Sequence, residues 1–265
     1  MTYGAGCDIS LPEFSSSRLL EKFIQEKFPK LSAPPEGALS LIFINCPGSR
    51  VFTDPRSGSR KCLDQVKLAL DFAADLTKTT HEKAEDIVVL SPSAAHCEAI
   101  GHMRKKRPEY TASLINVPES STIDGYQGRE NDIVIVAMGT SEFAGPLFTS
   151  NENRLNVMFT RQHCGLVIVG ELKAVGLSKK GGLDAVVKTH DAEGNMIYTR
   201  AGALRRVYKA LKDEGRIVDV TIERTRQKRT PYENEPTRVL SVTRSHRLKR
   251  EHDKRVTFAR RLKIH

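Results

Sequence analysis

The chain has 265 residues, enough for one large domain or two small ones, because domains typically contain about 100–200 residues. Its hydrophobic content is 39%, no apolar run approaches the roughly 18 residues of a membrane span, and five scattered cysteines form no CxxC pair. These features exclude a membrane-spanning protein and a zinc or disulfide framework, and they predict an intracellular protein of the nucleus or cytoplasm with reduced thiols.

The first predicted elements alternate between helices and apolar strands. A helix is predicted over Ser17–Phe28, a buried strand over Leu39–Asn45, an amphipathic helix over Lys61–Leu76 and a second buried strand over Ile87–Leu90. Ser91 is predicted to cap the next helix, with Pro92 at the first helical position, because proline has no N–H group to leave unpaired there.

The same alternation continues through the middle of the chain. A short strand is predicted over Ser113–Val117, a strand over Ile133–Met138, a helix over Glu152–His163 and a strand over Gly165–Gly170. This order predicts an α/β fold, a parallel sheet flanked by helices on both faces. The polar stretch STIDGYQGRENDIVIV, residues 121–136, is then expected beyond the carboxyl end of the Ser113–Val117 strand, where such sheets bind ligands.

The character of the sequence changes after Leu172. A surface loop is followed by a predicted hairpin with its turn at Glu193–Asn195 and by a helix over Ala201–Asp213, and from Thr221 we expect weak order. The chain is therefore divided into 1–38 (irregular or helical), 39–175 (α/β domain), 176–220 (linker, hairpin and helix) and 221–265 (basic tail).

The net charge of +10 arises from an excess of basic residues at the end of the chain. From Arg200 to His265 there are 20 Lys or Arg against 8 Asp or Glu, whereas the first 199 residues carry 22 against 24. A basic tail attracts polyanions, of which nucleic acid is the commonest inside cells. The alternative, a solvated tail without a specific partner, stays open at this point.

Two arginines in NENRLNVMFTRQHCGLVIVG, residues 151–170, suggest an anion site. On one helix, Arg154 and Arg161 are seven residues apart and share nearly the same face, which suits a polyanion such as a triphosphate. The alternative is that they pair with surface carboxylates such as Glu152. The sequence contains no GxxxxGK[ST] phosphate loop, and no residues are predicted to bind a metal.

These two stretches, with DIVVLSPSAAH at residues 86–96, resemble motifs V, VI and IV of superfamily 1 helicases of the nonsense-mediated-decay and splicing-endonuclease type. The matching positions in motifs V and VI are Thr122, Asp124, Tyr126, Gln127, Gly128, Arg129, Glu130, Asp132, Arg154, Leu155, Asn156, Val157, Thr160 and Arg161. In motif IV, Ser93 and His96 stand where the family usually has Tyr and Gln. The resemblance covers roughly residues 39–172 and implies the second RecA-like domain of a P-loop NTPase helicase.

The resemblance also implies roles for individual residues. ATP with magnesium would bind between two RecA-like domains, the first of which, with its phosphate loop and magnesium ligands, would act in cis or in trans. Arg161 would be the catalytic arginine at the γ-phosphate and Glu130 the ribose ligand, with Gln127, Gly128 and Arg154 also at the nucleotide. Ser91, Pro92 and Thr122 would contact RNA or single-stranded DNA. The alternative is a motorless nucleic-acid-binding or regulatory module.

Overall fold

The computed structural model describes residues 9–54, 57–80, 82–176, 186–190, 195–222 and 240–243. Its centre is a seven-stranded sheet in the order β11-β10-β1-β7-β6-β4-β5. The strands are β1 (Ser40–Asn45), β4 (Ile87–Ser91), β5 (Ser121–Thr122), β6 (Asn131–Ala137), β7 (Gln162–Gly170), β10 (Ile217–Ile222) and β11 (Leu240–Thr243). Every neighbouring pair is parallel except β10 with β11.

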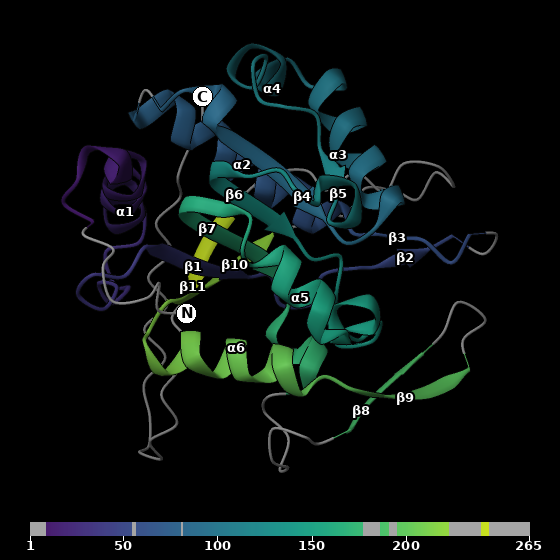
Figure 1. The fold of residues 1–265 in the computed structure, drawn as a ribbon. Coiled ribbons are helices and arrows are strands. Elements are labelled where there is room, and N and C mark those ends of the chain that lie inside the picture. Colours follow the sequence, from purple (N-terminus) through teal and green to yellow (C-terminus); the bar gives the residue numbers. More distant parts are fainter. Residues whose placement is uncertain are drawn as a thin grey trace.

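Helices cover both faces of this sheet, which confirms the predicted α/β class (Figure 1). One face carries α1 (Ser15–Lys27), α2 (Leu63–Thr80), α3 (Ala94–Lys106) and α4 (Pro108–Ser113), and the other carries α5 (Glu152–Met158) and α6 (Gly202–Asp213). Alternate residues of one strand enter opposite cores: Ile133 and Ile135 of β6 pack under α2, whereas Val134 and Val136 face α5 and α6. The middle residues of the central strands are apolar on both sides because both faces are buried there, whereas polar residues such as Asn131 and His163 lie near the strand ends.

Two antiparallel hairpins stand outside the main sheet. One pairs β2 (Phe52–Thr53) with β3 (Arg60–Lys61), and the other pairs β8 (Val186–His190) with β9 (Met196–Arg200). The second hairpin was predicted, although residues 193–194 of its expected turn lie outside the described part of the chain. None of the described helices is both long and apolar enough to traverse a lipid bilayer.

The predicted strand over Ser113–Val117 is wrong. Pro108 starts the short helix α4, which ends at Ser113, and the following turn buries Leu114 and Val117. These two apolar residues are three positions apart, so they share one side of a turn rather than alternating across a strand. The fifth strand is instead Ser121–Thr122, which pairs with Leu90–Ser91.

The helix predicted over Glu152–His163 is shorter than expected, because α5 ends at Met158. Three side chains supply donors to carbonyls at the end of this helix: Thr160 bonds to the carbonyl of Asn156, Arg161 to that of Val157 and Gln162 to that of Phe159. These side-chain donors replace the backbone N–H groups that a further helical turn would offer to the same carbonyls. Gln162 begins β7, so Arg161 lies in the bend between helix and strand.

Ser91 does not cap α3, contrary to the prediction. It is the last residue of β4, and the N-cap position is occupied by Ser93, whose backbone is extended (φ −123°, ψ 132°). The segment after Leu172 contributes to the main sheet through β10, which pairs with β1. Most of the predicted basic tail lies outside the described residues, and within it Leu240–Thr243 forms the edge strand β11.

Candidate nucleotide and nucleic-acid site

The motif V loop crosses one face of the sheet from the carboxyl end of β5 to the amino end of β6. A single 3-10 turn, Asp124–Tyr126, follows β5, and the hydroxyl of Thr122 accepts the backbone N–H of Gly125 at 3.1 Å. Tyr126 is 1% exposed and anchors the loop in the core between the sheet and α5 and α6. Gln127, Gly128, Arg129 and Glu130 are all exposed.

Glu130 and Arg161 lie side by side, although 31 positions separate them in the sequence. Glu130 directly precedes β6 and Arg161 directly precedes β7, and these strands are neighbours. The backbone N–H of Asn131 donates to the carbonyl of Arg161 at 3.0 Å. The two candidate nucleotide ligands therefore meet at the amino edge of the sheet, and not beyond the carboxyl ends where the sequence placed the loop.

Histidine 163 contacts two carboxylates at the same edge. Its Nε2 is 2.5 Å from Oε2 of Glu130, and its Nδ1 is 3.5 Å from Oδ1 of Asp132. The Glu130 side chain is 48% exposed, so one oxygen is held in place while the carboxylate stays accessible to a ligand. The sequence analysis did not single out His163, because its role depends on the pairing of β6 with β7.

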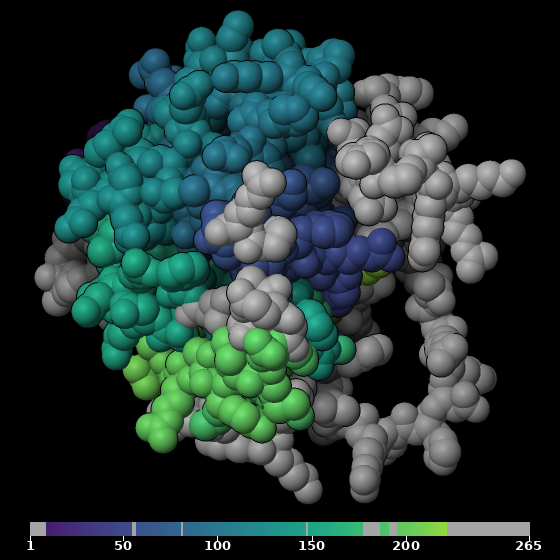
Figure 2. Space-filling view, turned by 90° about the vertical axis from the view of Figure 1, so that its right-hand side faces the viewer, coloured from purple at the N-terminus to yellow at the C-terminus, as the bar shows by residue number. Residues whose placement is uncertain are grey.

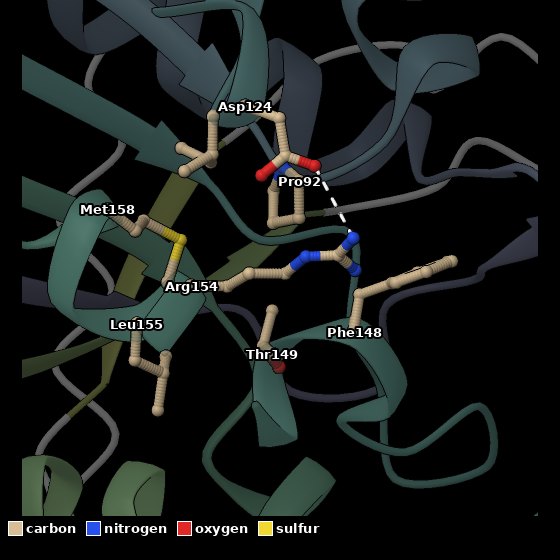
Figure 3. Close-up of a pocket in the computed structure, with 8 residues that line it drawn as sticks. Pro92, Asp124, Phe148, Thr149, Arg154, Leu155 and Met158 are labelled. Atoms are coloured by element: carbon tan, nitrogen blue, oxygen red, sulfur yellow. Dashed lines mark ion pairs between the residues drawn. The ribbon is translucent and has the colours of Figure 1, made fainter. Parts of the chain in front are cut away.

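Arg154 lies at the other edge of the sheet, in the first turn of α5. Its guanidinium is 3.4 Å from Asp124 and 5.1 Å from the ring centre of Phe148. Figure 3 shows the Arg154 side chain between these two residues. The alternative that the arginines pair with surface carboxylates thus holds for Arg154, with Asp124 as partner, whereas Glu152 pairs with Arg206. No carboxylate among the described residues forms an ion pair with Arg161.

A small pocket surrounds Arg154. Its lining residues come from the ends of β4 and β5, from the 3-10 turn Leu147–Ser150 (η4) and from α5, and they are Pro92, Ile123, Asp124, Phe148, Thr149, Arg154, Leu155 and Met158 (Figure 3). The pocket therefore contains one predicted nucleic-acid residue, Pro92, and one predicted nucleotide residue, Arg154. Phe148 and Thr149 were not predicted, because their turn carries no motif that marks it in the sequence.

The predicted residues thus form two groups at opposite edges of the sheet. Glu130 and Arg161 lie at the amino edge, whereas Pro92, Thr122 and Arg154 lie at the carboxyl edge. Because β6 has 7 residues, the two edges are about 20 Å apart along the strands, at about 3.3 Å per residue. The prediction that Arg154 and Arg161 project from one helical face is wrong, since α5 ends before Arg161.

Ser91 differs from Pro92 and Thr122, the other two predicted nucleic-acid residues, because it is fully buried. Its hydroxyl is 2.9 Å from Nδ1 of His96, whose Nε2 is 3.1 Å from the carbonyl of Cys62. Pro92 and Thr122 are half-buried and reach the surface. A phosphate contact by Ser91 would require its hydrogen bond with His96 to open.

A largely parallel sheet with helices on both faces is consistent with a RecA-like helicase domain. The chain belongs to the AAA domain family (AAA_12), whose model matches residues 15–173, from the start of α1 to just beyond β7. The match confirms the resemblance to superfamily 1 helicases of the nonsense-mediated-decay type and identifies a helicase-related region.

Three relatives are described as helicases or as a regulator of nonsense transcripts. A "probable helicase" of Dictyostelium discoideum is 31% identical over 132 residues, 48% of this chain and 13% of that protein. The regulator of nonsense transcripts 1 homolog of Neurospora crassa is 31% identical over 94 residues, 35% of this chain and 9% of its own length. DNA polymerase alpha-associated DNA helicase A of Saccharomyces cerevisiae is 41% identical over 90 residues, 34% of this chain and 12% of its own. The chain therefore spans only a small part of each relative.

Proposed function

We propose that this chain is the C-terminal RecA-like half of an ATP-dependent RNA or DNA helicase of the nucleus or cytoplasm. Glu130 holds the nucleotide ribose and Arg161 reaches the γ-phosphate. Gln127 and Gly128 lie on the motif V loop, which leads to Glu130. Arg154 pairs with Asp124 at the beginning of that loop. Pro92 and Thr122, together with Ser91 once its hydroxyl is released, contact the nucleic-acid backbone.

The observation that carries this proposal is the adjacency of Glu130 and Arg161. An exposed carboxylate suits the hydroxyl groups of a ribose, and an arginine that pairs with no carboxylate of the described residues retains its charge for phosphate oxygens. Arg161 is held by hydrogen bonds from Nε to the carbonyl of Val157 and from Nη2 to the hydroxyl of Thr160, so its position is defined without neutralisation. Arg154 is already paired with Asp124.

The residues present fit one side of an ATP site. ATP with magnesium supplies the phosphoryl group that is transferred to water, and Arg161 would offset the charge that develops on it. The sequence contains no GxxxxGK[ST], and the described residues contain no cluster of His, Cys, Asp or Glu suited to a metal. We therefore assign the phosphate loop and the magnesium ligands to a first RecA-like domain, supplied in cis or in trans.

The test begins with the message that encodes the chain. Mapping the 5′ end of the transcript shows whether a phosphate loop and an acidic motif are read in frame upstream of Met1. In the protein translated from that message, Arg161→Ala should lower kcat for ATP hydrolysis by about 10³-fold or more, the range expected for an arginine finger. Glu130→Ala should chiefly raise KM for ATP.

Arg154→Ala is the matched control, since it removes an arginine from the same motif at the opposite edge of the sheet. It should weaken nucleic-acid binding more than ATP turnover. If Arg154→Ala abolishes hydrolysis while Arg161→Ala leaves kcat unchanged, the assignment is wrong.

The second candidate function is a motorless module that binds nucleic acid. The departure in motif IV favours it, because Ser93 and the fully buried His96 stand where the family usually has Tyr and Gln. A message that begins at Met1, with oligonucleotide binding that does not respond to ATP or to Arg161→Ala, would establish it in place of the helicase.

A further inference from the structure

The β8–β9 hairpin has one buried face and one exposed face. On the inner face, Val187 is 5% exposed and Thr189 is fully buried. The outer face alternates with these residues and presents aliphatic, aromatic and cationic side chains: Val186, Lys188, Met196, Tyr198 and Arg200. Tyr198 is 69% exposed, which is unusual for a large aromatic ring.

The pairing of the two strands places cations beside apolar groups. Lys188 lies directly opposite Tyr198, and Val186 lies opposite Arg200. The hydroxyl of Tyr198 donates to the sulfur of Met196 at 3.4 Å, so the two side chains lie side by side on this face. Neither strand contains an Asp or Glu, so Lys188 and Arg200 have no acidic neighbour within the strands themselves; Asp191 and Glu193 of the connecting segment lie outside the described residues.

The hairpin is held against the body of the domain by a buried arginine. The Arg60 guanidinium donates to the carbonyl of His190 at 3.1 Å and to that of Ala144 at 2.6 Å. Burial lowers the pKa of Arg60 to about 10, so it remains charged at neutral pH. The ring of His190 stacks on Phe143 with centres 4.3 Å apart. These contacts present the outer face as a preformed surface.

This hairpin lies next to the candidate nucleic-acid residues. Strand β9 contacts η4, the turn that carries Phe148 into the pocket with Pro92 and Arg154. Figure 1 shows both hairpins extending to the same side of the molecule, and in Figure 2 residues of β2–β3 and of β8–β9 occupy neighbouring parts of that face. The hairpin therefore lies beside η4, which lines the pocket at the carboxyl edge of the sheet.

We propose that the outer face of β8–β9 binds a single-stranded polynucleotide, with a base stacked on Tyr198 and phosphates at Lys188 and Arg200. Aromatic rings with adjacent cations bind single strands in this way, because every base offers a ring face and every nucleotide a negative charge. The surface would extend the track that begins at Pro92 and Thr122, so the inference rests on the nucleic-acid part of the proposed function.

Fluorescence anisotropy of labelled uridine and thymidine oligonucleotides with the full chain tests this inference. Tyr198→Ala should weaken binding by about 5- to 100-fold, the loss expected for one stacked base, while Tyr198→Phe should bind like the wild type. Lys188→Ala with Arg200→Ala should reduce the slope of log affinity against log salt by about 1.4, at about 0.7 per phosphate contact. The two oligonucleotides decide between RNA and DNA.

Ile115→Ala is the matched control, because Ile115 is 70% exposed and follows α4 on the other side of the sheet. It should leave the affinity unchanged, and circular dichroism should show that all variants are folded. If the wild type binds and Tyr198→Ala binds equally well, the hairpin is not part of the track, although the proposed function stands. If the wild type binds neither oligonucleotide, this inference and the nucleic-acid part of the proposed function both fail. If Tyr198→Ala instead changes the oligomeric state in sedimentation, the surface binds a second copy and the inference is overturned.

Discussion

At the scale of single residues, His96 illustrates how a motif position can be filled by a structural group. Its Nε2 faces the carbonyl of Cys62, and a carbonyl oxygen can only accept a hydrogen bond. We therefore assign the ring hydrogen to Nε2. Nδ1 is then the acceptor and receives the hydroxyl hydrogen of Ser91. The ring is fully buried, and burial lowers its pKa to about 4. His96 is therefore neutral at physiological pH and positions the end of β4.

This histidine predicts a defined acid response of stability. His96 is protonated near pH 6.5 in the unfolded chain and only near pH 4 in the folded chain. Between these pH values the unfolded state therefore binds more protons. The free energy of unfolding consequently falls as the pH falls. The loss should reach ~3 kcal/mol by pH 4, at ~1.4 kcal/mol per pKa unit. Urea denaturation of the wild type and His96→Gln across this range measures it.

The difference between the two proteins isolates His96. Burial raises the pKa values of Glu82, Asp86 and Glu171, which contribute in the opposite sense, but these groups are common to both proteins. If the stability of His96→Gln falls with pH as steeply as that of the wild type, the ring is not the source of the response.

At the scale of elements, the motif V loop depends on one backbone conformation. Gly128 has φ of +80°, a left-handed conformation that side chains disfavour, and a Cβ there would meet no atom within 4 Å. The cost of Gly128→Ala is therefore one of backbone conformation alone, and it should lower the free energy of unfolding by ~1–2 kcal/mol. Urea denaturation provides the measurement.

Gly101→Ala is the matched control for that substitution. Gly101 lies inside α3, and a Cβ there also meets no atom within 4 Å. Since alanine favours helices over glycine, this variant should gain up to ~1 kcal/mol. Equal effects of the two substitutions would contradict the left-handed conformation of the loop.

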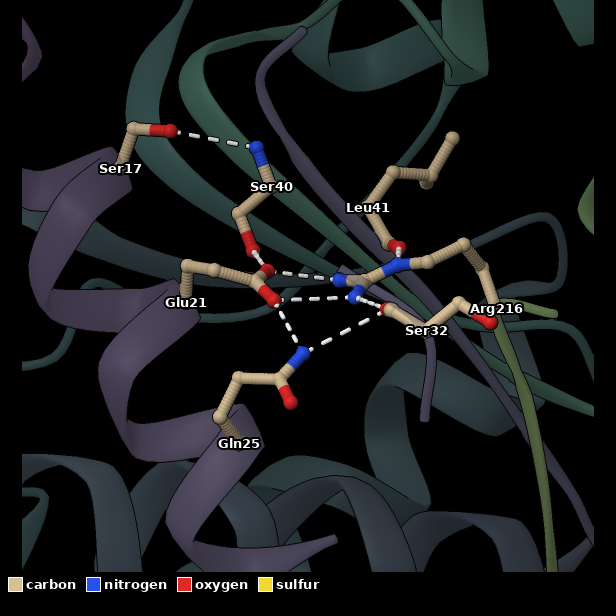
Figure 4. A network of polar contacts seen from close by, with 7 residues as sticks. All are labelled: Ser17, Glu21, Gln25, Ser32, Ser40, Leu41 and Arg216. Atoms are coloured by element: carbon tan, nitrogen blue, oxygen red, sulfur yellow. Dashed lines mark hydrogen bonds and ion pairs between the residues drawn. The ribbon is translucent and has the colours of Figure 1, made fainter. Parts of the chain in front are cut away.

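At the scale of the whole molecule, a buried ion pair joins segments 195 residues apart. Arg216, 1% exposed at the start of β10, pairs with Glu21 of α1 at 2.6 Å (Figure 4). The same guanidinium donates to the carbonyls of Leu41 and Ser32, and Glu21 also accepts from Ser40 and Gln25. Four of the five N–H donors of the guanidinium and both carboxylate oxygens are hydrogen-bonded, so the two charges are compensated although the arginine is out of reach of water.

Arg216→Met should lower the free energy of unfolding by about 3–5 kcal/mol, because it leaves the Glu21 carboxylate without its charge partner. The exposed pair Lys209–Asp213 on α6 offers the comparison, and Lys209→Met should change stability by less than about 1 kcal/mol. Thermal or urea unfolding of both variants measures the difference. Similar small losses in the two would mean that α1 and β10 are held together by apolar packing alone.

Several features of the fold were predictable from the sequence because they depend on neighbouring residues. The apolar runs of β1, β4, β6 and β7 indicate strands buried on both faces, and the spacing of Leu63, Val66 and Leu70 indicates a helix. The family was indicated by the resemblance of residues 121–136 and 151–170 to motifs V and VI of a known helicase family. β5, β10 and β11 were missed. β5 has only two residues and therefore no periodicity, the apolar run of β10 is interrupted by Asp219 and Thr221, and β11 is an edge strand that is recognised only beside its partner.

The sequence by itself therefore determined the class of fold, the helicase family and the residues that merit attention. Only the tertiary structure decided how those residues are grouped, with Glu130 beside Arg161 at one edge of the sheet and Arg154 beside Asp124 at the other. It also placed Tyr198 on an exposed hairpin face. The physical reason is that local periodicity encodes which face of an element is buried, whereas the pairing of distant strands decides at which edge each loop arrives.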